Sequence, residues 1–336
     1  MKKTPTQKII LVWLMVLLLP VFGWGNWPAE AEAADSVSYR LKWLFNMSVA
    51  GDLYADVHQL FDRQGLDVTV KEGGPERDAI RELELGRAQF GVASADQVIR
   101  AVSKGAAVVV IAQLFQVNPL QWMYRPDKMK IDRLADLKGH TLGVTFGGND
   151  ETILKTLLAK AGLADTDVTL FSVRYDYMPF FQKKVNFWPV YRNSQAVFLG
   201  QKLRQAGETY AFFNPTDYGV RFVANSVVTS RSMLEKQPEV VHKFTVALLK
   251  GWQAAMDPAN APKTINMLRQ YDKDSTLETL QEQLTITRRL IQPDPSVPVG
   301  TIDMAAWKQT EEIMLDQKQI TAPVQVDKYL QPIPRY

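Results

Sequence analysis

The sequence contains no cysteine among its 336 residues. A chain without thiols cannot form disulfides, bind zinc or an iron–sulfur cluster through cysteine, or use a thiolate as a nucleophile. It also lacks the cysteine that carries the lipid of a bacterial lipoprotein. Any catalytic or binding function of this chain must therefore use side chains other than cysteine.

Histidine is scarce as well, and the three histidines, His58, His140 and His242, lie far apart in the sequence. None has a neighbour at the spacing of a metal site. No phosphate-binding loop, dinucleotide fingerprint, zinc-protease motif or serine-hydrolase motif is present. The sequence therefore predicts a protein that is not an enzyme and that has no metal, no cofactor and no catalytic residue.

Charge of one sign is not concentrated anywhere in the chain. The formal net charge is +3, and no run of lysine and arginine is long enough to bind nucleic acid. The content of 46 % hydrophobic and 22 % charged residues is typical of a globular protein. We therefore expect no nucleic-acid partner.

The only long apolar run lies near the N-terminus, at 9–19, after Lys2, Lys3 and Lys8. It is followed at 29–34 by the alanine-rich sequence AEAEAA, which offers small residues at the positions that signal peptidase reads. This pattern predicts a signal peptide over 1–34, cleaved near Ala33, and an exported protein that is periplasmic or extracellular. The alternative is that the segment is kept as an anchor.

From Val37 onwards, short apolar strands alternate with amphipathic helices. The strand 141–146, the pair Gly147-Gly148 and a helix over 151–161 are the clearest unit, with Asn149 or Asp150 as the expected helix cap. Other strands are expected at 39–45, 66–70, 90–94, 108–114, 168–173, 187–191 and 222–228. The alternation predicts an α/β fold with mainly parallel sheets and a helical C-terminal tail.

Two successive strand–helix blocks, followed by helices, predict two lobes. We expect lobe 1 to comprise 35–118 plus 222–336 and lobe 2 to comprise 119–221. The chain then crosses twice between the lobes, which makes a hinge. Ligands of open α/β sheets bind beyond the carboxyl ends of the strands, so we expect a ligand cleft between the lobes.

The predicted strand ends carry aromatic rings, amides and glycines. Rings can stack on a flat ligand, amides suit the edges of a heterocycle, and glycines let a ligand approach the backbone. The candidate ligand-binding residues are Trp43, Asn46, Gly74, Ser94, Asp96, Phe115, Gly147, Gly148, Asn149, Glu151, Trp188, Tyr191 and Gln195. The alternative for each aromatic is a place in the core, and for each Asn, Asp or Ser a helix cap.

Several segments together resemble a known family, the periplasmic substrate-binding proteins of ABC transporters for sulfonates, nitrate and thiamine-pyrimidine precursors. The resemblance covers about 41–256 and is closest to the thiamine-precursor-binding branch. The more specific segments are WLFNMSVAGDLYA at 43–55, SADQ at 94–97 and WPVY at 188–191. More general ones are GLDV at 65–68, GGP at 73–75 and KGW at 250–252.

The resemblance implies a two-lobed type II periplasmic-binding fold that closes like a Venus flytrap on a small-molecule ligand. It implies that Trp43 and Tyr191 stack on the ligand ring from the two lobes. Gln195 stands where the family carries a carboxylate that grips an amino edge, so a related heterocycle is a possible ligand beside a thiamine-pyrimidine precursor. The implied partners are the transmembrane subunits of an ABC permease with their ATPase, and the implied state is a monomer.

Two alternatives stay open from the sequence. The first keeps the fold and changes the ligand to an alkanesulfonate, taurine or nitrate, although Arg174 and Arg192, the best candidate cations, are expected to face solvent. The second is an enzyme like the pyrimidine synthases that the same resemblance includes. That branch depends on a cysteine-rich iron motif, which this chain lacks.

Overall fold

The computed structural model describes residues 35–74, 76–174 and 176–334. The predicted signal peptide over 1–34 lies outside these residues. The largest sheet has five strands, four from the first part of the chain and one from a later segment. The strands lie in the order β2-β1-β3-β10-β4. Their bounds are β1 Asp35–Arg40, β2 Leu66–Lys71, β3 Phe90–Ala93, β4 Val108–Gln113 and β10 Ser226–Ser230. Strand β1 pairs in parallel with β2 and β3, whereas β10 is antiparallel to β3 and β4.

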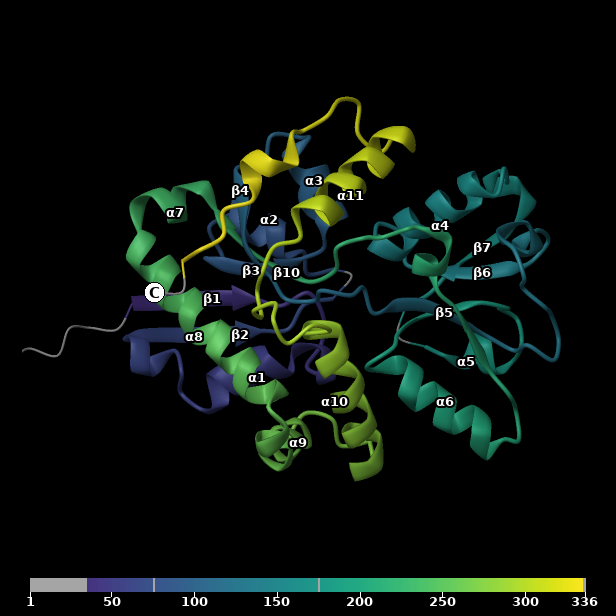
Figure 1. The fold of residues 1–336 in the computed structure, drawn as a ribbon, viewed down its shortest axis with the longest axis horizontal. Coiled ribbons are helices and arrows are strands. Elements are labelled where there is room, and N and C mark those ends of the chain that lie inside the picture. The colour runs from purple at the N-terminus through teal and green to yellow at the C-terminus, as the bar shows by residue number, and fades with distance from the viewer. Residues whose placement is uncertain (1–34, 75, 175, 335–336) are drawn as a thin grey trace, which may run out of the picture. The chain divides into compact units, whose positions relative to one another are not determined.

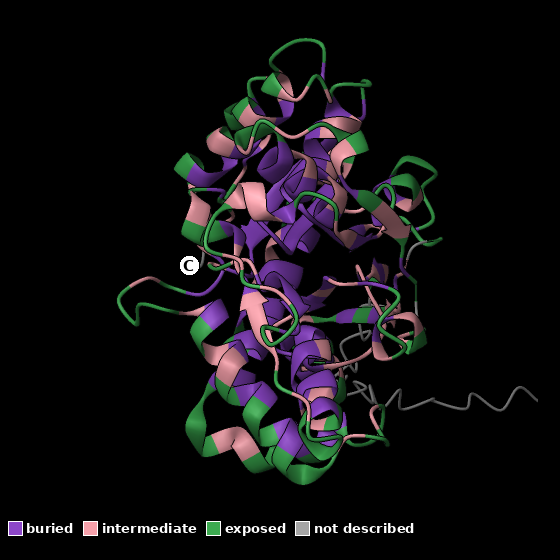
Figure 2. Ribbon diagram, turned by 90° about the vertical axis from the view of Figure 1, so that its right-hand side faces the viewer, coloured by how far each residue is buried: buried purple, intermediate pink, exposed green. Residues whose placement is uncertain are grey.

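Helices cover both faces of this sheet (Figure 1). On one face, the core joins the strands to α1 Ala50–Val57, α8 Pro238–Met256, α9 Ala261–Leu268 and α10 Leu277–Ile291. On the other, it joins them to α2 Ala79–Glu84, α3 Ala95–Val102 and α11 Met304–Asp316. Figure 2 shows the buried residues along the strands and inner helix faces, with the exposed residues in loops and outer turns.

The second part of the chain forms two smaller sheets. Strands β5 Leu120–Tyr124, β8 Trp188–Tyr191 and β9 Ala211–Phe213 pair in antiparallel fashion, with β5 in the centre. Strands β6 Thr141–Val144 and β7 Thr169–Ser172 are parallel. One core lies between these strands and α4 Asn149–Lys160, and another lies with α5 Met178–Phe181 and α6 Gln195–Gln205.

Short helices complete the chain. Helix α7 spans Arg231–Lys236. The single-turn 3-10 helices are η1 Met47–Val49, η2 Asp62–Gln64, η3 Leu134–Leu137, η4 Asp165–Asp167, η5 Pro215–Tyr218, η6 Pro258–Asn260 and η7 Val326–Tyr329. In the part of the chain that the structure describes, no helix has the length and apolar character needed to span a bilayer.

The predicted α/β class is confirmed, with three differences in detail. The first strand ends at Arg40, so Trp43 lies in a loop rather than in a strand. Strands β5 and β9 were not predicted. The return strand β10 is antiparallel because it re-enters the sheet between β3 and β4 from the opposite direction. The lobe bounds, 35–118 plus 222–336 and 119–221, stay a prediction.

The segment after α10 closes the β4 edge of the first sheet. Leu330 forms a parallel bridge to Val110, and Gly300 forms an antiparallel bridge to Gln113. The Gln113 side-chain oxygen accepts hydrogen bonds from the Trp307 indole at 3.2 Å and from the Asp303 amide at 3.0 Å. The Gln113 backbone amide donates to the Gly300 carbonyl at 3.2 Å, and the Gln331 amide donates to the Val110 carbonyl at 2.8 Å. These two bonds satisfy backbone groups that the edge strand would otherwise leave unpaired.

Helices α1 and α8 approach each other closely because two glycines lie at their contact. A Cβ atom at Gly251 would lie 2.6 Å from the Ala55 Cβ and 2.7 Å from the Gly51 carbonyl oxygen. A Cβ at Gly51 would lie 2.1 Å from the Trp252 ring. Neither Cβ atom could be accommodated unless the two helices moved apart.

We predict that Gly251→Ala lowers the free energy of unfolding by about 2 kcal/mol, because overpacking outweighs the better helix propensity of alanine. Urea unfolding followed by circular dichroism measures the change. The matched control is Lys250→Ala at the exposed neighbouring position of the same helix, which should leave stability within about 0.5 kcal/mol. Equal stability of Gly251→Ala and the wild type would contradict the packing described above.

Candidate functional site

A cavity of about 760 Å³ lies where the loops after β1, β6 and β8 meet. Its wall also includes the end of β3, the N-terminal part of α6, and the loop between α9 and α10. Nine of the predicted site residues line it: Trp43, Asn46, Gly74, Gly147, Gly148, Asn149, Trp188, Tyr191 and Gln195. The cavity therefore brings together residues from the ends of four strands, as the strand-end argument predicts.

Aromatic side chains form much of the wall. Trp43 and Tyr191 are both half-buried and both line the cavity, so their rings are accessible to a ligand. Trp188 is 2 % exposed and packs on Phe180, with ring centroids 6.0 Å apart. Further rings also line the cavity: Phe45, Phe146, Tyr177, Phe198 and Tyr271. The wall is thus suited to flat, partly apolar ligands.

The Lys42 ammonium, which the sequence prediction missed, links both sides of the cavity. It lies 3.4 Å from the Asn149 Oδ1 atom and 3.4 Å from the Tyr191 hydroxyl oxygen. Lys42 directly precedes Trp43, just beyond the end of β1, so its position in the sequence was a usable signal. A half-buried cation at this point gives the cavity a positive end.

The turn between β6 and α4 is held by its own side chains. Gly148 is the N-cap residue, so the prediction that Asn149 or Asp150 caps α4 is wrong. The Asp150 carboxylate instead accepts a hydrogen bond from the Thr145 amide at 2.6 Å. A Cβ at Gly148 would lie 2.5 Å from the Asp150 Oδ1 atom, which explains the glycine there. Burial raises the pKa of Asp150 to about 6, and the hydrogen bond from Thr145 opposes that shift.

Gln195 uses its side-chain oxygen within its own loop. The Oε1 atom accepts hydrogen bonds from the Tyr191 amide at 3.0 Å and from the Ser194 hydroxyl at 2.7 Å. The amide nitrogen is therefore the atom that Gln195 offers to a ligand. This arrangement makes Gln195 a hydrogen-bond donor, whereas a carboxylate at this position would be an acceptor.

Four predicted site residues do not line the cavity. Phe115 is 1 % exposed and packs edge-on against Trp252 in the core, because the chain turns inward after β4. Ser94 caps α3, where its amide and hydroxyl both donate to the Gln97 Oε1 atom. Asp96 and Glu151 pair with basic residues of their own helices.

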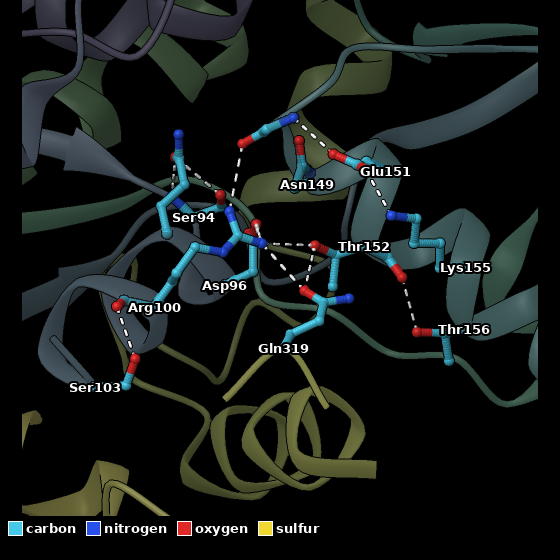
Figure 3. Close-up of polar contacts among 12 residues, drawn as sticks. Ser94, Asp96, Arg100, Ser103, Asn149, Glu151, Thr152, Lys155, Thr156 and Gln319 are labelled. Carbon is cyan, nitrogen blue, oxygen red and sulfur yellow. Dashed lines mark hydrogen bonds and ion pairs between the residues drawn. The ribbon is translucent and has the colours of Figure 1, made fainter. Parts of the chain in front are cut away.

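Glu151 completes the turn before α4 rather than the cavity wall (Figure 3). Its carboxylate accepts a hydrogen bond from the Gly147 amide at 2.7 Å and forms an ion pair with Lys155 at 2.7 Å. The prediction that Glu151 lies in the first helical turn is confirmed. Its effect on the cavity is indirect, because it fixes the conformation of the glycine pair.

Asp96 is fully buried and lies beside Arg100 on the same helix, 3.8 Å from its guanidinium. Arg100 extends from α3 to α4 and to the C-terminal segment (Figure 3). It donates hydrogen bonds to the Thr152 hydroxyl at 3.0 Å and to the Gln319 Oε1 atom at 3.1 Å. The Asp96 carboxylate is therefore the counter-ion of Arg100 in this polar cluster and is not part of the cavity wall.

We predict that Arg100→Met lowers the free energy of unfolding by about 2 kcal/mol, because it leaves the Asp96 carboxylate buried without its counter-ion. The double variant Arg100→Met/Asp96→Asn should recover part of that loss, since it removes the unpaired charge. Chemical unfolding of the two variants and of Asp96→Asn completes the cycle. Equal losses in the single and double variants would mean that the ion pair does not carry the effect.

Other charged residues at the cavity were also missed or placed differently. Arg174 lines the cavity although its side chain is 73 % exposed, and it pairs with Glu76 at 3.6 Å. Arg192 does not line the cavity and lies over the Phe212 ring at 4.9 Å. Arg77, the loop 271–275 and Gln283 of α10 line it as well. Within the described residues, no group of three or more acidic or histidine side chains could hold a metal ion.

Comparison with characterised proteins gives consistent matches. A formylaminopyrimidine-binding protein of Halalkalibacterium halodurans is 26 % identical over 314 residues, which are 90 % of this chain and 91 % of the relative. The riboflavin-binding protein RibY of Chloroflexus aurantiacus is 23 % identical over 314 residues, 90 % of this chain and 86 % of the relative.

A solved structure shows the same fold. The alkanesulfonate-binding protein SsuA of Xanthomonas axonopodis pv. citri, bound to MOPS, superposes with a TM-score of 0.65 at 17 % identity. The match covers 90 % of this chain and all of that structure. The fold is therefore the two-lobed type II fold of periplasmic binding proteins. The family described as NMT1/THI5 like matches residues 46–261, more than half of the sequence, and the chain belongs to this family.

Proposed function

We propose that this protein is the extracytoplasmic solute-binding component of an ABC importer for a small aromatic heterocycle, of the class of thiamine-pyrimidine precursors. The observation that carries the proposal is the cavity itself, which joins the rings of Trp43 and Tyr191 to a small number of amide groups. Stacking rings favour a flat ligand, and amides along the wall select the edges of its ring.

The size of the cavity agrees with such a ligand. Pockets for small organic molecules typically measure about 300–1,000 Å³ and combine apolar walls with few polar groups. The cavity of about 760 Å³ falls within this range. The relatives that match 90 % of the chain are named for binding formylaminopyrimidine and riboflavin, which are both aromatic heterocycles.

Capture works through closure of the two predicted lobes, 35–118 plus 222–336 and 119–221. A ligand that contacts both walls binds the closed arrangement more tightly, and this difference in affinity shifts the population towards closure. The closed monomer then docks on the permease subunits, whose ATPase supplies the energy of transport. Export with cleavage near Ala33 places the mature chain on the outer side of the membrane.

A ligand panel tests the function. Protein purified without refolding is analysed by native mass spectrometry and by thermal unfolding with thiamine-pyrimidine precursors, flavins, alkanesulfonates and nitrate. We expect a mass or a stabilisation that identifies a heterocycle, because a bound ligand raises the apparent stability. Recovery of that ligand unchanged after incubation is the expected result for a binding protein, whereas a chemically altered ligand would indicate an enzyme. No shift with any heterocycle would overturn the proposal.

The second candidate is a receptor for alkanesulfonate, taurine or nitrate. It is favoured by the Lys42 ammonium and by the N-terminus of α4, which both line the cavity and both attract anions. The aromatic wall gives a small anion little to contact. The same panel separates the two candidates, since a sulfonate receptor should respond to taurine and not to pyrimidines.

A further inference from the structure

The Lys42 ammonium lines the cavity without a direct ion pair among the described residues, although its charge opposes the rise that burial causes in the pKa of the Asp150 carboxylate. Among the described residues, no carboxylate oxygen lies within 4.0 Å of the Lys42 Nζ atom; its neighbours are the Asn149 and Tyr191 oxygens, each at 3.4 Å. The nearby Asp150 carboxylate is bound to the Thr145 amide at 2.6 Å. An ammonium group has three hydrogens to donate, and a half-buried one gains most from an anionic or strongly polar oxygen.

Asn149 adds a second donor at the same place. The residue is 6 % exposed, and its Oδ1 atom accepts the Lys42 hydrogen bond, which orients the amide group. The Nδ2 atom is buried and has no hydrogen-bond partner within the described chain. A buried donor without an acceptor is costly, so this atom is suited to an oxygen that a ligand supplies. Asn149 is also the first residue of α4, where the helix dipole favours negative charge.

Gln283, elsewhere on the cavity wall, offers a hydrogen-bond acceptor rather than a donor. It is 3 % exposed, and its Nε2 atom donates to the Ser194 carbonyl at 3.2 Å. That bond orients the amide so that the buried Oε1 atom, which has no partner in the described residues, is an acceptor. The buried Oδ1 atom of Asn225, also on the wall, is a second such acceptor. A ligand N–H or O–H group would satisfy them.

We propose that the cavity selects heterocycles that carry an anionic or carbonyl oxygen, which Lys42 and Asn149 bind, and that it rejects ligands with a cationic substituent at that position. The N–H groups of the same heterocycle are matched by the Gln283 and Asn225 oxygens. This inference rests on the proposed heterocycle receptor and specifies which heterocycles it accepts. Lys42 is thus a residue that determines specificity.

The alternative is that Lys42 only ties the loop after β1 to α4 and β8. A structural role would change the affinity of every ligand by a similar factor. A role in recognition changes the ratio of affinities between ligands that differ in one substituent. The experiment therefore compares ratios rather than single affinities.

The probes are three 4-amino-2-methylpyrimidines that differ only at C5, carrying formylaminomethyl, hydroxymethyl phosphate or aminomethyl groups. Isothermal titration of the full mature chain should show that the carbonyl and phosphate compounds bind roughly 10- to 100-fold more tightly than the cationic aminomethyl compound. In Lys42→Met this ratio should fall to about 3-fold or less. Lys42→Arg, the matched control, keeps the charge and should keep most of the ratio.

Each outcome has one meaning. A parallel loss for all three probes in Lys42→Met, or equal binding of the aminomethyl compound by the wild type, would overturn the inference and leave the receptor function standing. Absence of binding by all three probes, with a response to a sulfonate and to no heterocycle in the panel, would overturn the heterocycle receptor and the inference together. Melting temperatures of the variants close to that of the wild type exclude misfolding as the cause.

Discussion

Replacing Trp43 by alanine is expected to weaken the binding of a heterocyclic ligand by roughly 10- to 100-fold. Alanine substitution of an aromatic side chain that stacks on a base typically costs about 1–3 kcal/mol. Trp43 lies on the loop after β1, lines the cavity and is only half-buried, so its ring can meet a ligand. Isothermal titration with the ligand identified in the panel measures the loss.

The control for this prediction is Trp43→Phe, which keeps a ring and should retain most of the affinity. An alkanesulfonate, if it binds at all, should lose much less affinity in Trp43→Ala, because it has no ring to stack. Unchanged affinity for the heterocycle in Trp43→Ala, with the fold intact by circular dichroism, would remove the stacking role. That result would also favour the sulfonate receptor over the heterocycle receptor.

The local sequence pattern was sufficient to predict most strands of the five-stranded sheet. The run at 108–114 is entirely apolar apart from Gln113, which agrees with β4 buried on both faces. Glycines in the left-handed region follow local elements: Gly65 follows η2, Gly86 follows α2 and Gly105 follows α3. Such signals are contained within a few residues, which is why they can be read without the fold.

The remaining strands depend on pairing between segments far apart in the sequence, which the local pattern does not show. Six residues separate the end of β4 from the start of β5, and β9 is only three residues long. Both are strands because β5 pairs on one side with β8 and on the other with β9. The direction of β10 is likewise set by the path of the chain between the sheets, and no periodicity within 222–230 encodes it.

The site was predictable where it lies at strand ends and not where the helical tail contributes. The strand-end argument placed Trp43, Asn149 and Tyr191 on one cavity. It also selected Phe115, which packing holds in the core. The loop 271–275 joins α9 to α10 and reaches the cavity only because those helices pack beneath the first sheet. Amphipathic helices show which face is buried, but not which loop borders a ligand.

Stability of the protein should fall as the pH rises from about 4 to 7, because of one buried carboxyl group. Asp52 of α1 is 1 % exposed, and the Tyr39 hydroxyl donates to its Oδ1 atom at 2.5 Å. Burial raises the pKa of Asp52 from 3.8 to about 7, and the hydrogen bond from Tyr39 limits the rise. The folded state therefore binds the proton more tightly than the unfolded state.

The sign follows from this difference in proton binding. Below pH 4 both states hold the proton, and the stabilising effect of the neutral group is fully present. Between pH 4 and 7 the unfolded state has lost the proton and the folded state retains it, so the free energy of unfolding decreases by up to about 1.4 kcal/mol per pH unit. Above pH 7 both states are charged, and the loss stops at roughly 4 kcal/mol.

Asp52→Asn isolates this contribution, because asparagine keeps the shape and the acceptor for Tyr39 without a titrating proton. Relative to the wild type, the variant should gain roughly 4 kcal/mol of stability between pH 4 and pH 8. Urea unfolding at both pH values measures the gain, and Asp165→Asn at an exposed position is the matched control. The difference between variant and wild type cancels other titrating groups, including the buried Asp150. A difference that stays constant from pH 4 to pH 8 would show that Asp52 titrates alike in both states and that its burial does not hold the proton.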